Sequence, residues 1–550
     1  MITTDVAIIG GGPSGLMLAI ELGCRGITCT VLEEDPTDPQ LPKANATSAR
    51  TMEHFRRRGF SHRIRALGLP PDHPQDVVYT TRVAQHELTR FRIPSAGEAA
   101  QQASFGDYGG DAWPTPELPH RAQQMYIEPV LRSEAEKYPS VTVRFGARAV
   151  AVSDRGDDVR VDVMGVDGQA LPPLVARYVV GCDGPRSLVR QTMGFGYSGH
   201  GGERREFLGG QMLSIYFRAS GLYEQLNKPR AWQYWAVNPE QRCVLCAING
   251  VDTFVMIVQL AEGQALESLD IPDVLRKSMG LTFAHDVIAL TPWNAGLALV
   301  AERFRQGRLF IAGDAAHLFT PTGGMGYNTS VDDAVNLGWK LAHVLRGQAP
   351  AALLDTYQAE RQPMAYRNTA FARRMADGIG RLRVGAEVEA PGAEGEQARQ
   401  RLAVALAAHV TQEFNIPGLQ LGVRYTGSSI VAVEDALPPP DEPNCYVPSG
   451  YPGGRAPHVV TSEGSLLDHF GIDHTLLVLT EISTEAWQSE AQRIGLPLAV
   501  LRWQQAATRE LYGADLVLVR PDHHIAWRGP AHTDPAIVLA RATACFAAPA

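Results

Sequence analysis

Two acidic residues, each beside a glycine at the end of an apolar run, are the strongest candidates for binding chemistry. Asp183 follows the apolar run 176–181 and precedes Gly184, and Asp314 follows the apolar run 309–312. In α/β sheets, ligands bind outside the carboxyl ends of the strands, which is where both acids fall if these runs are strands. The sequence therefore predicts a ligand-binding edge that carries two carboxylates.

The segment after Asp314 is rich in glycine and leads into a helical pattern. Glycines stand at positions 323, 324 and 326, and apolar residues at helical spacing follow from 331 to 345. Glycine lets main-chain amides approach a ligand closely, and the N–H groups at the start of a helix favour negative charge. The segment 321–328 is therefore a candidate binding site built from backbone atoms.

A Gly-x-Gly-x-x-Gly pattern at Gly10, Gly12 and Gly15 predicts a dinucleotide-binding turn. It follows a predicted strand at 5–9 and opens a predicted helix at 16–25, which is the context that this pattern requires. The glycines permit a tight turn, close approach of a pyrophosphate and close packing of the helix on the sheet. A glycine turn without a ligand is the weaker interpretation, because both flanking elements are present.

Glu33 ends the second predicted strand, 27–33, at a distance after the fingerprint where an acid accepts hydrogen bonds from ribose hydroxyls. The neighbouring Glu34 is an alternative, but one residue further along a strand its side chain points to the opposite face. We therefore favour Glu33.

Length and composition indicate several domains and exclude some classes of function. The chain has 550 residues, with 45% hydrophobic and 20% charged residues and a formal net charge of −9. An acidic chain is poorly suited to nucleic acid. The N-terminus lacks the basic region of a signal peptide, and no apolar run reaches the ~18 residues of a membrane span. We expect a cytoplasmic protein without a nucleic-acid or membrane partner.

The cysteines do not suggest a disulfide framework or a metal site. Seven cysteines are scattered along the chain, and only Cys243 and Cys246 have the spacing of a metal or redox pair. Those two lie within a predicted strand and have no second pair, so a packing role is favoured over chemistry. We expect no bound metal.

Strand and helix patterns predict an α/β fold of interleaved parts. Alternating apolar residues between turn signals predict a mostly antiparallel sheet in the middle of the chain, and short strands alternating with helical stretches predict a small α/β domain at its end. The predicted segments are 1–76, 120–190 and 291–382 for the nucleotide-binding domain, 77–119 and 191–290 for the second domain, 383–420 for a connecting segment that is exposed at 383–400, and 421–550 for the small domain.

Three motifs stand in order along the chain: the glycine fingerprint at 10–15, Asp183-Gly184 and Gly313-Asp314. Together they resemble the class A flavoprotein monooxygenases, the aromatic hydroxylases typified by para-hydroxybenzoate hydroxylase and phenol hydroxylase. The resemblance covers residues 1–375. The C-terminal part resembles the thioredoxin-like domain of the phenol-hydroxylase branch, although its only cysteines, Cys445 and Cys545, form no Cys-x-x-Cys pair for thiol–disulfide exchange.

This resemblance implies a Rossmann-like FAD-binding domain interleaved with a substrate-binding sheet. It also implies the cofactors: FAD, NADH or NADPH as a transient reductant, and O2. By resemblance, Gly10, Gly12 and Gly15 hold the FAD pyrophosphate, Glu33 holds the adenosine ribose, and Asp314 holds the ribityl and pyrophosphate portion. Gln124 lies near the flavin linkage, and Asp183 and Gly184 serve both FAD and the nicotinamide cofactor. The residues expected along the flavin ring are Pro321, Gly324, Gly326, Tyr327 and Asn328. Lys43 stands where the family usually has arginine, so the charge is kept but the bidentate fork is lost.

The chemistry implied by the resemblance has two halves. NADH or NADPH reduces FAD, and O2 then adds to the flavin to give a C4a-hydroperoxide, which transfers OH to an electron-rich ring. A phenolate is more electron-rich than a phenol, so the protein should promote deprotonation and exclude water. No base is assigned, because His317 follows Gly-Asp-Ala-Ala directly and is favoured as a residue that positions the flavin loop.

The predicted sheet departs from the hydroxybenzoate enzymes where they clamp a carboxylate with serine and arginine. Ala247 and Asn249 take these positions, and neither pairs with a carboxylate. An uncharged phenolic or polyketide-like aromatic substrate is therefore favoured, although Arg218 could substitute. Alternation along the strands gives the pocket candidates Gln211, Trp232, Tyr234 and Trp293, for which packing in the core is the competing role.

Two other functions are compatible with part of the sequence. A flavin halogenase shares this fold, but its Trp-x-Trp-x-Ile-Pro segment is absent, and Trp232-Gln-Tyr-Trp235 does not match it. A flavin-binding module without turnover, such as a redox sensor or a docking scaffold, is disfavoured by the intact glycines and both acids. The sequence does not select NADH or NADPH, nor an oligomeric state, and a homodimer is kept as an option.

Overall fold

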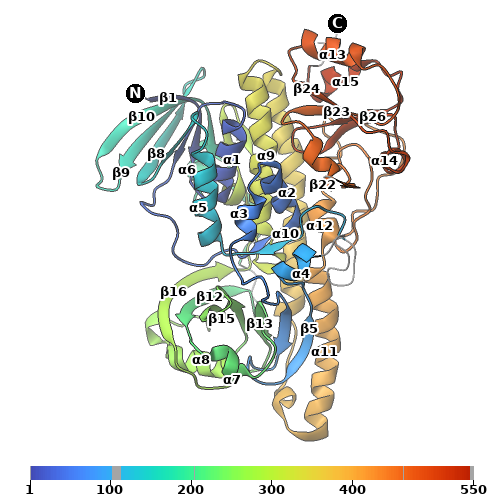
Figure 1. Ribbon diagram of the computed structural model, residues 1–550. Coiled ribbons are helices and arrows are strands. Elements are labelled where there is room, and N and C mark those ends of the chain that lie inside the picture. Colours follow the sequence, from blue (N-terminus) through green and yellow to red (C-terminus); the bar gives the residue numbers. More distant parts are fainter. Residues whose placement is uncertain (1, 102–112, 203–204, 463, 546–550) are drawn as a thin grey trace.

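The computed structural model describes residues 2–101, 113–202, 205–462 and 464–545, so part of the predicted second-domain segment 77–119 lies outside the described residues. The protein has an α/β fold with two large sheets and a smaller C-terminal sheet (Figure 1). Long helices run between and beside these sheets: α9 (Met325–Leu345), α10 (Asp355–Gly380) and α11 (Gly392–Phe414). No helix among the described residues is long and apolar enough to cross a membrane.

The first sheet is mainly parallel and brings the fingerprint and the acids to one edge. Its strands are β18 (Arg305–Gln306), β19 (Leu309–Ile311), β10 (Ala170–Gly181), β1 (Ile2–Ile9), β2 (Cys29–Leu32) and β7 (Val141–Arg144) in that order, with β8 (Ala147–Asp154) and β9 (Val159–Gly165) continuing from β10. β1 pairs parallel with β2 and β10, and β10 pairs parallel with β19. The carboxyl ends of these four strands therefore meet.

Helices α1 (Pro13–Gly23), α5 (Gln124–Ala135) and α6 (Leu188–Met193) pack against this sheet, and α9 packs on α1. The apolar residues of α1 are buried throughout, as expected for a helix that lies between α5 and α9. α1 begins three residues before its predicted start, because Pro13 at the first helical position has the backbone angle and the missing N–H that this position tolerates.

The second sheet is mainly antiparallel, as predicted. Its order is β16 (Asp286–Ala295), β12 (Gly210–Arg218), β15 (Thr253–Gln259), β14 (Cys243–Ala247), β13 (Gln233–Ala236), β4 (Val77–Thr80) and β5 (Glu87–Phe91), and only β13 and β4 pair in parallel. Phe217 and Phe254 stack on one face of it, and Phe254 contacts Tyr223 of α7 (Leu222–Leu226). This face is thus covered by α7, next to α8 (Ile271–Met279) in the lower part of Figure 1.

Many of residues 383–400 are exposed, as predicted, but the segment is not an irregular linker throughout, because α11 begins at Gly392 and runs for 23 residues. Ala398, Leu402, Leu406 and Val410 are buried at intervals of four, which is the stripe of a helix packed on one side. The helix lies along β5, at the edge of the second sheet (Figure 1). The prediction followed the Gly, Ala and Glu content and overlooked that Ala, Glu, Gln and Arg are strong helix formers.

The C-terminal sheet has the order β24 (Leu498–Arg502), β23 (His474–Val478), β25 (Leu516–Val519) and β26 (Ile525–Gly529). β23 and β24 are parallel, whereas β25 and β26 are antiparallel to their neighbours. With α13 (Glu485–Arg493), α14 (Ala506–Tyr512) and α15 (Pro535–Ala542) between and after them, the strands have a thioredoxin-like topology. We call residues 449–545 the C-terminal unit. Cys445 and Cys545 are both free and exposed.

Shorter elements complete the described chain. They are α2 (Ala49–Arg57), α3 (Ser61–Arg65), α4 (Ala96–Gln101), α12 (Pro417–Leu421), β3 (Ala46–Thr47), β6 (His120–Arg121), β11 (Tyr197–His200), β17 (Ala298–Ala301), β20 (His317–Leu318), β21 (Val460–Thr461) and β22 (Gly464–Ser465), with 3-10 turns at Leu266–Ser268, Gly313–Ala315, Thr322–Gly324, Ala351–Leu354, Ala386–Glu389 and Leu466–His469.

Candidate active site

The glycine fingerprint forms a tight turn at the edge of the first sheet. Gly10 has a φ of +105°, and a Cβ there would lie 2.2 Å from the carbonyl oxygen of Cys182. A Cβ on Gly15 would lie 2.0 Å from the carbonyl oxygen of Gly10. Gly12 differs, because a Cβ there would meet nothing within 4 Å. Gly10 and Gly15 are thus required by the fold, whereas Gly12 borders open space.

Gly12 is also the N-cap of α1, and no side chain caps this helix. The first N–H groups of an uncapped helix lack partners and favour an anion. Glu33 lies beside this turn and accepts hydrogen bonds from the N–H groups of Gly11 at 2.6 Å and Asp35 at 2.9 Å. A carboxylate has about four acceptor positions, so Glu33 keeps room for ribose hydroxyls.

Asp183 lies at the end of β10, next to the fingerprint turn. Its Oδ2 accepts the N–H of Leu188 at 2.7 Å, while its buried Oδ1 makes no hydrogen bond. Burial raises the pKa of this carboxyl above its usual range. A buried oxygen without a donor is expected to find one in a ligand.

Asp314 lies at the end of β19, in the turn before β20. Its side chain has accessible surface, yet desolvation by the surrounding protein raises its pKa, while His317 and Lys43 lower it. The carboxylate thus stands at the carboxyl edge of the sheet with surface left for a ligand. The position suits a carboxylate that accepts hydrogen bonds from ligand hydroxyls.

The segment 321–328 is not a loop throughout, because α9 begins at Met325. Gly323 and Gly324 have φ values of +68° and +61°, so the chain turns sharply before Gly324, the N-cap, which makes no side-chain cap bond. Gly326 and Tyr327 therefore lie in the first helical turn, where N–H groups lack intrahelical partners. Ser14 of α1 donates to the carbonyl oxygen of Ser330 at 3.3 Å, so the starts of α1 and α9 are adjacent.

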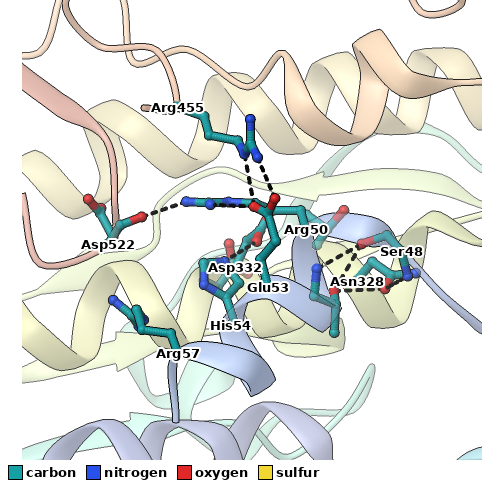
Figure 2. Close-up of polar contacts among 12 residues, drawn as sticks. Ser48, Arg50, Glu53, His54, Arg57, Asn328, Asp332, Arg455 and Asp522 are labelled. Carbon is teal, nitrogen blue, oxygen red and sulfur yellow. Dashed lines mark hydrogen bonds and ion pairs between the residues drawn. The ribbon is translucent and has the colours of Figure 1, made fainter. Parts of the chain in front are cut away.

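The side chain of Asn328 is fully engaged within the protein (Figure 2). Its Oδ1 accepts the N–H of Ser48 at 2.7 Å and the hydroxyl of Thr51 at 2.8 Å, and its Nδ2 donates to the carbonyl oxygens of Ala46 at 2.8 Å and Gly324 at 2.7 Å. An amide has two donors and two acceptor positions on its oxygen, so none remains. Asn328 shapes the segment around the site, and only its backbone is left for a ligand.

Gln124, Lys43 and Glu128 gather at the start of α5. The N–H of Gln124 donates to the carbonyl oxygen of Ala44 at 2.7 Å, and its side-chain amide donates to Glu128. The Gln124 side-chain oxygen is left as an acceptor. Lys43 is exposed but close enough to act electrostatically on both Glu128 and Asp314. Sequence analysis missed Glu128, which the helical spacing of four from Gln124 could have revealed.

These residues fit FAD. The open space at Gly12 and the two uncapped helix starts suit a pyrophosphate and an anionic flavin ring. The acceptors at Glu33, Asp183 and Asp314 suit the hydroxyls of ribose and the ribityl chain. No cluster of metal-binding side chains occurs within the described part of the chain.

His317 is buried beneath this site. Its Nε2 lies 2.6 Å from Asp333 Oδ2, and the same carboxylate oxygen accepts the N–H of Gly313 at 3.2 Å. Arg361 donates to the other oxygen of Asp333 at 2.8 Å. His317 therefore stabilises the turn that carries Asp314, and no accessible surface of His317 is left to meet a substrate.

The second sheet presents one face to the flavin site and the other to α7. Trp293 pairs in register with Met212, so it shares a face with Ser214 and Tyr216. Trp293 donates to the Ser214 hydroxyl at 2.9 Å, and Tyr216 lies near Tyr126 of α5. Further along the same face, Cys246 lies beside Gln233 and beside Asn45, in the segment that precedes α2.

The structure does not bring Tyr234 and Gln211 together with Trp293 on one face of the sheet. Tyr234 has no accessible surface, and its hydroxyl accepts the N–H of Ala231 at 2.9 Å on the face toward α7. Gln211 is exposed, but it pairs with Asn294 and so points away from Trp293. Trp232 is 2% exposed and packs under the guanidinium of Arg121, 4.3 Å from its ring centre. The prediction used the alternation of side chains within each strand. It lacked the pairing register between strands, which decides which side chains share a face of the sheet.

Half-buried residues that sequence analysis missed lie around Trp293. Ser214, Tyr216, Tyr126 and Ile257 each keep part of their surface on the side toward the flavin site. They form, with Trp293, an aromatic and hydroxyl-bearing patch that we call the sheet patch. A stricter count of alternate residues from Trp293 through β12 would have found Ser214 and Tyr216.

Among the residues that the structure describes, no carboxylate clamp occurs on this face. Ala247 is buried, and Asn249 uses its oxygen to accept the N–H groups of Val251, Asp252 and Thr253 at 3.0 Å each. Arg218 lies at the far end of β12, with Nε 3.7 Å from Asp252. The structure thus places no unopposed cation among the sheet-patch residues.

Cys243 and Cys246 are both buried and free in β14. Residues three apart in a strand point to opposite faces, so these thiols cannot ligate one metal or form a disulfide with each other. Their packing role follows from this geometry.

Known protein families and relatives match most of the chain. Residues 3–372 match the family model of an FAD-binding domain, and residues 449–549 match that of the C-terminal domain of aromatic-ring hydroxylases. The aklavinone 12-hydroxylase RdmE of Streptomyces purpurascens is 32% identical, with 95% of each chain covered.

Two solved structures are similar over nearly the whole chain. The rebeccamycin biosynthetic enzyme RebC with reduced flavin superimposes with a TM-score of 0.88 at 31% identity, covering 98% of this chain and 99% of the other. Aklavinone-11 hydroxylase with FAD and aklavinone gives a TM-score of 0.80 at 28% identity, covering 98% and 99%. With its flavin-site geometry, its sheet patch and these matches, the chain belongs to the family of FAD-dependent aromatic-ring hydroxylases, which are monooxygenases.

Proposed function

We propose that this protein hydroxylates a phenolic ring of an uncharged, polyketide-like aromatic substrate, using FAD, O2 and NADH or NADPH. The observation that carries the proposal is the link between the uncapped start of α9 and the sheet face that bears the sheet patch: Gly324 lies against Ala46, and the neighbouring Asn45 lies beside Cys246 of that face. The sheet patch carries aromatic rings and hydroxyls but no unopposed cation. A flavin edge and a neutral aromatic ring would then face each other across one site.

Each group of residues has a separate task in this proposal. The turn at Gly10, Gly12 and Gly15 binds the pyrophosphate, and Glu33 binds the adenosine ribose. Asp314 and the Gln124 oxygen accept hydrogen bonds from the ribityl chain. Bound FAD would supply the acceptance of hydride and the activation of O2. The first N–H groups of α9 then stabilise negative charge at the flavin edge, as preorganised dipoles do in other active sites.

The substrate would lie on the sheet patch. Trp293 and Tyr216 offer aromatic surfaces, and the hydroxyls of Ser214 and Tyr216 are placed to orient a phenolic oxygen. Aklavinone, the compound named for two of the similar proteins, is consistent with a substrate of several fused rings. We include Asp183 and Gly184 as the contact for the nicotinamide cofactor, and a cytoplasmic location fits a reaction that consumes NADH or NADPH.

The test is a substrate screen with purified protein and FAD. Neutral polycyclic phenols, simple phenols and hydroxybenzoates are compared for stimulated oxidation of NADH and NADPH, and products are analysed by mass under ¹⁸O₂. We expect neutral polycyclic phenols to stimulate oxidation and to gain one labelled oxygen. Stimulation by hydroxybenzoates alone would contradict the absence of a carboxylate clamp.

A flavin protein without hydroxylase activity is the competing function. It would bind FAD, yet no phenol would accelerate NADH or NADPH oxidation and no labelled product would form. Tyr216→Phe sharpens the distinction, because it removes a hydroxyl from the sheet patch. We expect it to raise KM or to divert O2 to hydrogen peroxide, whereas Tyr234→Phe on the opposite face should leave both unchanged.

A further inference from the structure

Helix α2 lies between the start of α9 and the C-terminal unit (Figure 2). At the N-terminus of α2, Ser48 caps the helix by accepting the N–H of Thr51 at 3.1 Å. Ser48 and Thr51 also hold Asn328 Oδ1, and Asn328 in turn holds the carbonyl oxygen of Ala46. The position of α2 therefore decides how the segment 44–48 and the first turn of α9 sit beside the flavin site.

At its other side, α2 is held by a buried ionic cluster. Glu53 accepts from Arg455 Nε at 2.9 Å and, through its second oxygen, from Arg455 Nη2. Arg50 donates to Glu53 at 2.9 Å and to the carbonyl oxygen of Asp522. The side chain of Arg455 has no accessible surface, and that of Glu53 is 3% exposed. Arg455 and Asp522 both belong to the C-terminal unit.

A forked pair between a guanidinium and a carboxylate fixes both direction and distance. In a buried site, neither partner can turn to water, so Glu53 cannot leave Arg455 without a large loss. α2 is a single helix of nine residues, and Glu53 stands two positions after Thr51. A displacement of Glu53 would therefore be transmitted to Thr51, Ser48 and Asn328.

We propose that Arg455 is a positioning residue through which the C-terminal unit holds α2, and thereby Asn328 and the segment 44–48, against the bound flavin. This inference rests on the proposed function, since it assigns the flavin to that site. It gives the thioredoxin-like unit, which has no Cys-x-x-Cys pair, a task that needs no thiol: the unit is a rigid support for one wall of the flavin site.

The C-terminal unit also meets α2 at Arg56, whose partly exposed guanidinium forms a fork with Asp468 at 2.7 and 2.8 Å, and at Arg57, which donates to the carbonyl oxygen of Pro521. Further contacts of the unit reach other helices. Arg520 pairs with Glu360 of α10, and Asp473 pairs with Arg25 beyond the end of α1. Arg528 of the unit forms a similar fork with Glu434, which precedes the unit, at 2.9 and 2.8 Å. This fork is partly exposed, and neither residue belongs to α2. Arg528 thus offers a control for the loss of a guanidinium fork away from α2.

The experiment compares Arg455→Lys with Arg528→Lys. Each variant keeps its charge and loses its fork, which limits the damage to folding. In FAD-free protein, we expect amide hydrogens of residues 44–51 to exchange at least tenfold faster in Arg455→Lys than in Arg528→Lys. On adding FAD, the Kd should rise at least fivefold in Arg455→Lys alone, with a shift in the visible absorption bands of bound flavin.

A double-mutant cycle with Thr51→Val separates positioning from general loosening. If Arg455 and Thr51 both act through α2, the Kd for FAD of the double variant should lie within twofold of the Kd of the single variant that binds FAD more weakly. The inference would be overturned if the two single variants raised the Kd independently, so that their fold-changes multiplied in the double variant. It would also be overturned if the exchange rates and the Kd of Arg455→Lys lay within twofold of those of Arg528→Lys. A wild-type protein that binds no FAD would instead refute the proposed function, while the exchange measurement would still test the α2 connection.

Discussion

At the scale of single residues, Gly12 separates the needs of a ligand from those of the fold. Its φ of −72° suits any residue, and the space around its absent Cβ is open. We expect Gly12→Ala to melt at the wild-type temperature but to bind FAD at least about tenfold more weakly, a loss of about 1.4 kcal/mol. Titration of flavin fluorescence measures it.

Gly15→Ala is the contrasting variant, because its Cβ would clash with the carbonyl oxygen of Gly10. It should lower the melting temperature even without FAD. An FAD Kd for Gly12→Ala within twofold of wild type would mean that the pyrophosphate does not approach this turn.

Glu128 makes a prediction about pH. Burial raises its pKa to about 7 from an ordinary 4.5, with Gln124 and Lys43 lowering it in part. The folded protein thus holds this proton more tightly than the unfolded chain, so stability falls as pH rises from about 4.5 to 7 and is level above that range. The Glu128→Gln variant cannot ionise at this position, and its amide oxygen can still accept from Gln124.

We therefore expect Glu128→Gln to be within about 1 kcal/mol of wild type at pH 5 and more stable at pH 8, by at most about 3 kcal/mol. Urea unfolding of FAD-free protein at the two pH values measures the difference. Glu136→Gln, at an exposed position beyond the end of the same helix, should show no such change with pH. Equal effects at pH 5 and pH 8 would show that Glu128 is ionised throughout.

At the scale of elements, local pattern was enough for most strands and for the fingerprint turn. Buried parallel strands can be recognised from their runs of Val and Ile. The strand, glycine turn and helix of the fingerprint lie within 30 consecutive residues, so a local pattern is enough to predict them. α11 was missed because composition was weighed above spacing. The predicted pocket residues came from both faces of the second sheet, because the side chains that share a face depend on the pairing register between strands. That register, such as the one between β12 and β16, cannot be read from either strand alone.

The packing of α11 can be tested with two residues two positions apart. Leu406 is 1% exposed and Val404 is 74% exposed. Leu406→Ala should therefore lower the free energy of unfolding by about 2 to 5 kcal/mol, and Val404→Ala by less than about 0.5 kcal/mol. Denaturant unfolding measures both values. Similar small effects for the two would place α11 away from the second sheet.

At the scale of the whole molecule, buried charges join parts that are hundreds of residues apart. Glu53 meets Arg455, and Glu360 meets Arg520, across the boundary of the C-terminal unit. Charged residues are expected at the surface, and their pairing over such separations leaves no local pattern, so the sequence could not predict these contacts. They make the C-terminal unit part of one structure with the flavin-binding region.

A variant of Arg520 can test whether the C-terminal unit and the flavin-binding region unfold together. Arg520 donates to both oxygens of Glu360 at 2.8 Å and to Asp522 at 2.7 Å, and Lys340 lies 2.7 Å from the same Glu360. None of these side chains is more than 1% exposed. Arg520→Met leaves Asp522 buried without this partner, and it leaves Glu360 with the charge of Lys340 and the hydrogen bonds from Asn336 and Ser428. The loss should be about 3 to 5 kcal/mol in the free energy of unfolding. Arg493→Met, which removes an exposed pair with Glu490, should leave the transition unchanged.

Because the network spans both parts, tryptophan fluorescence and release of bound FAD should report one shared, shifted transition for Arg520→Met. Two separate transitions, with FAD retained through the first, would show instead that the C-terminal unit unfolds independently of the flavin site.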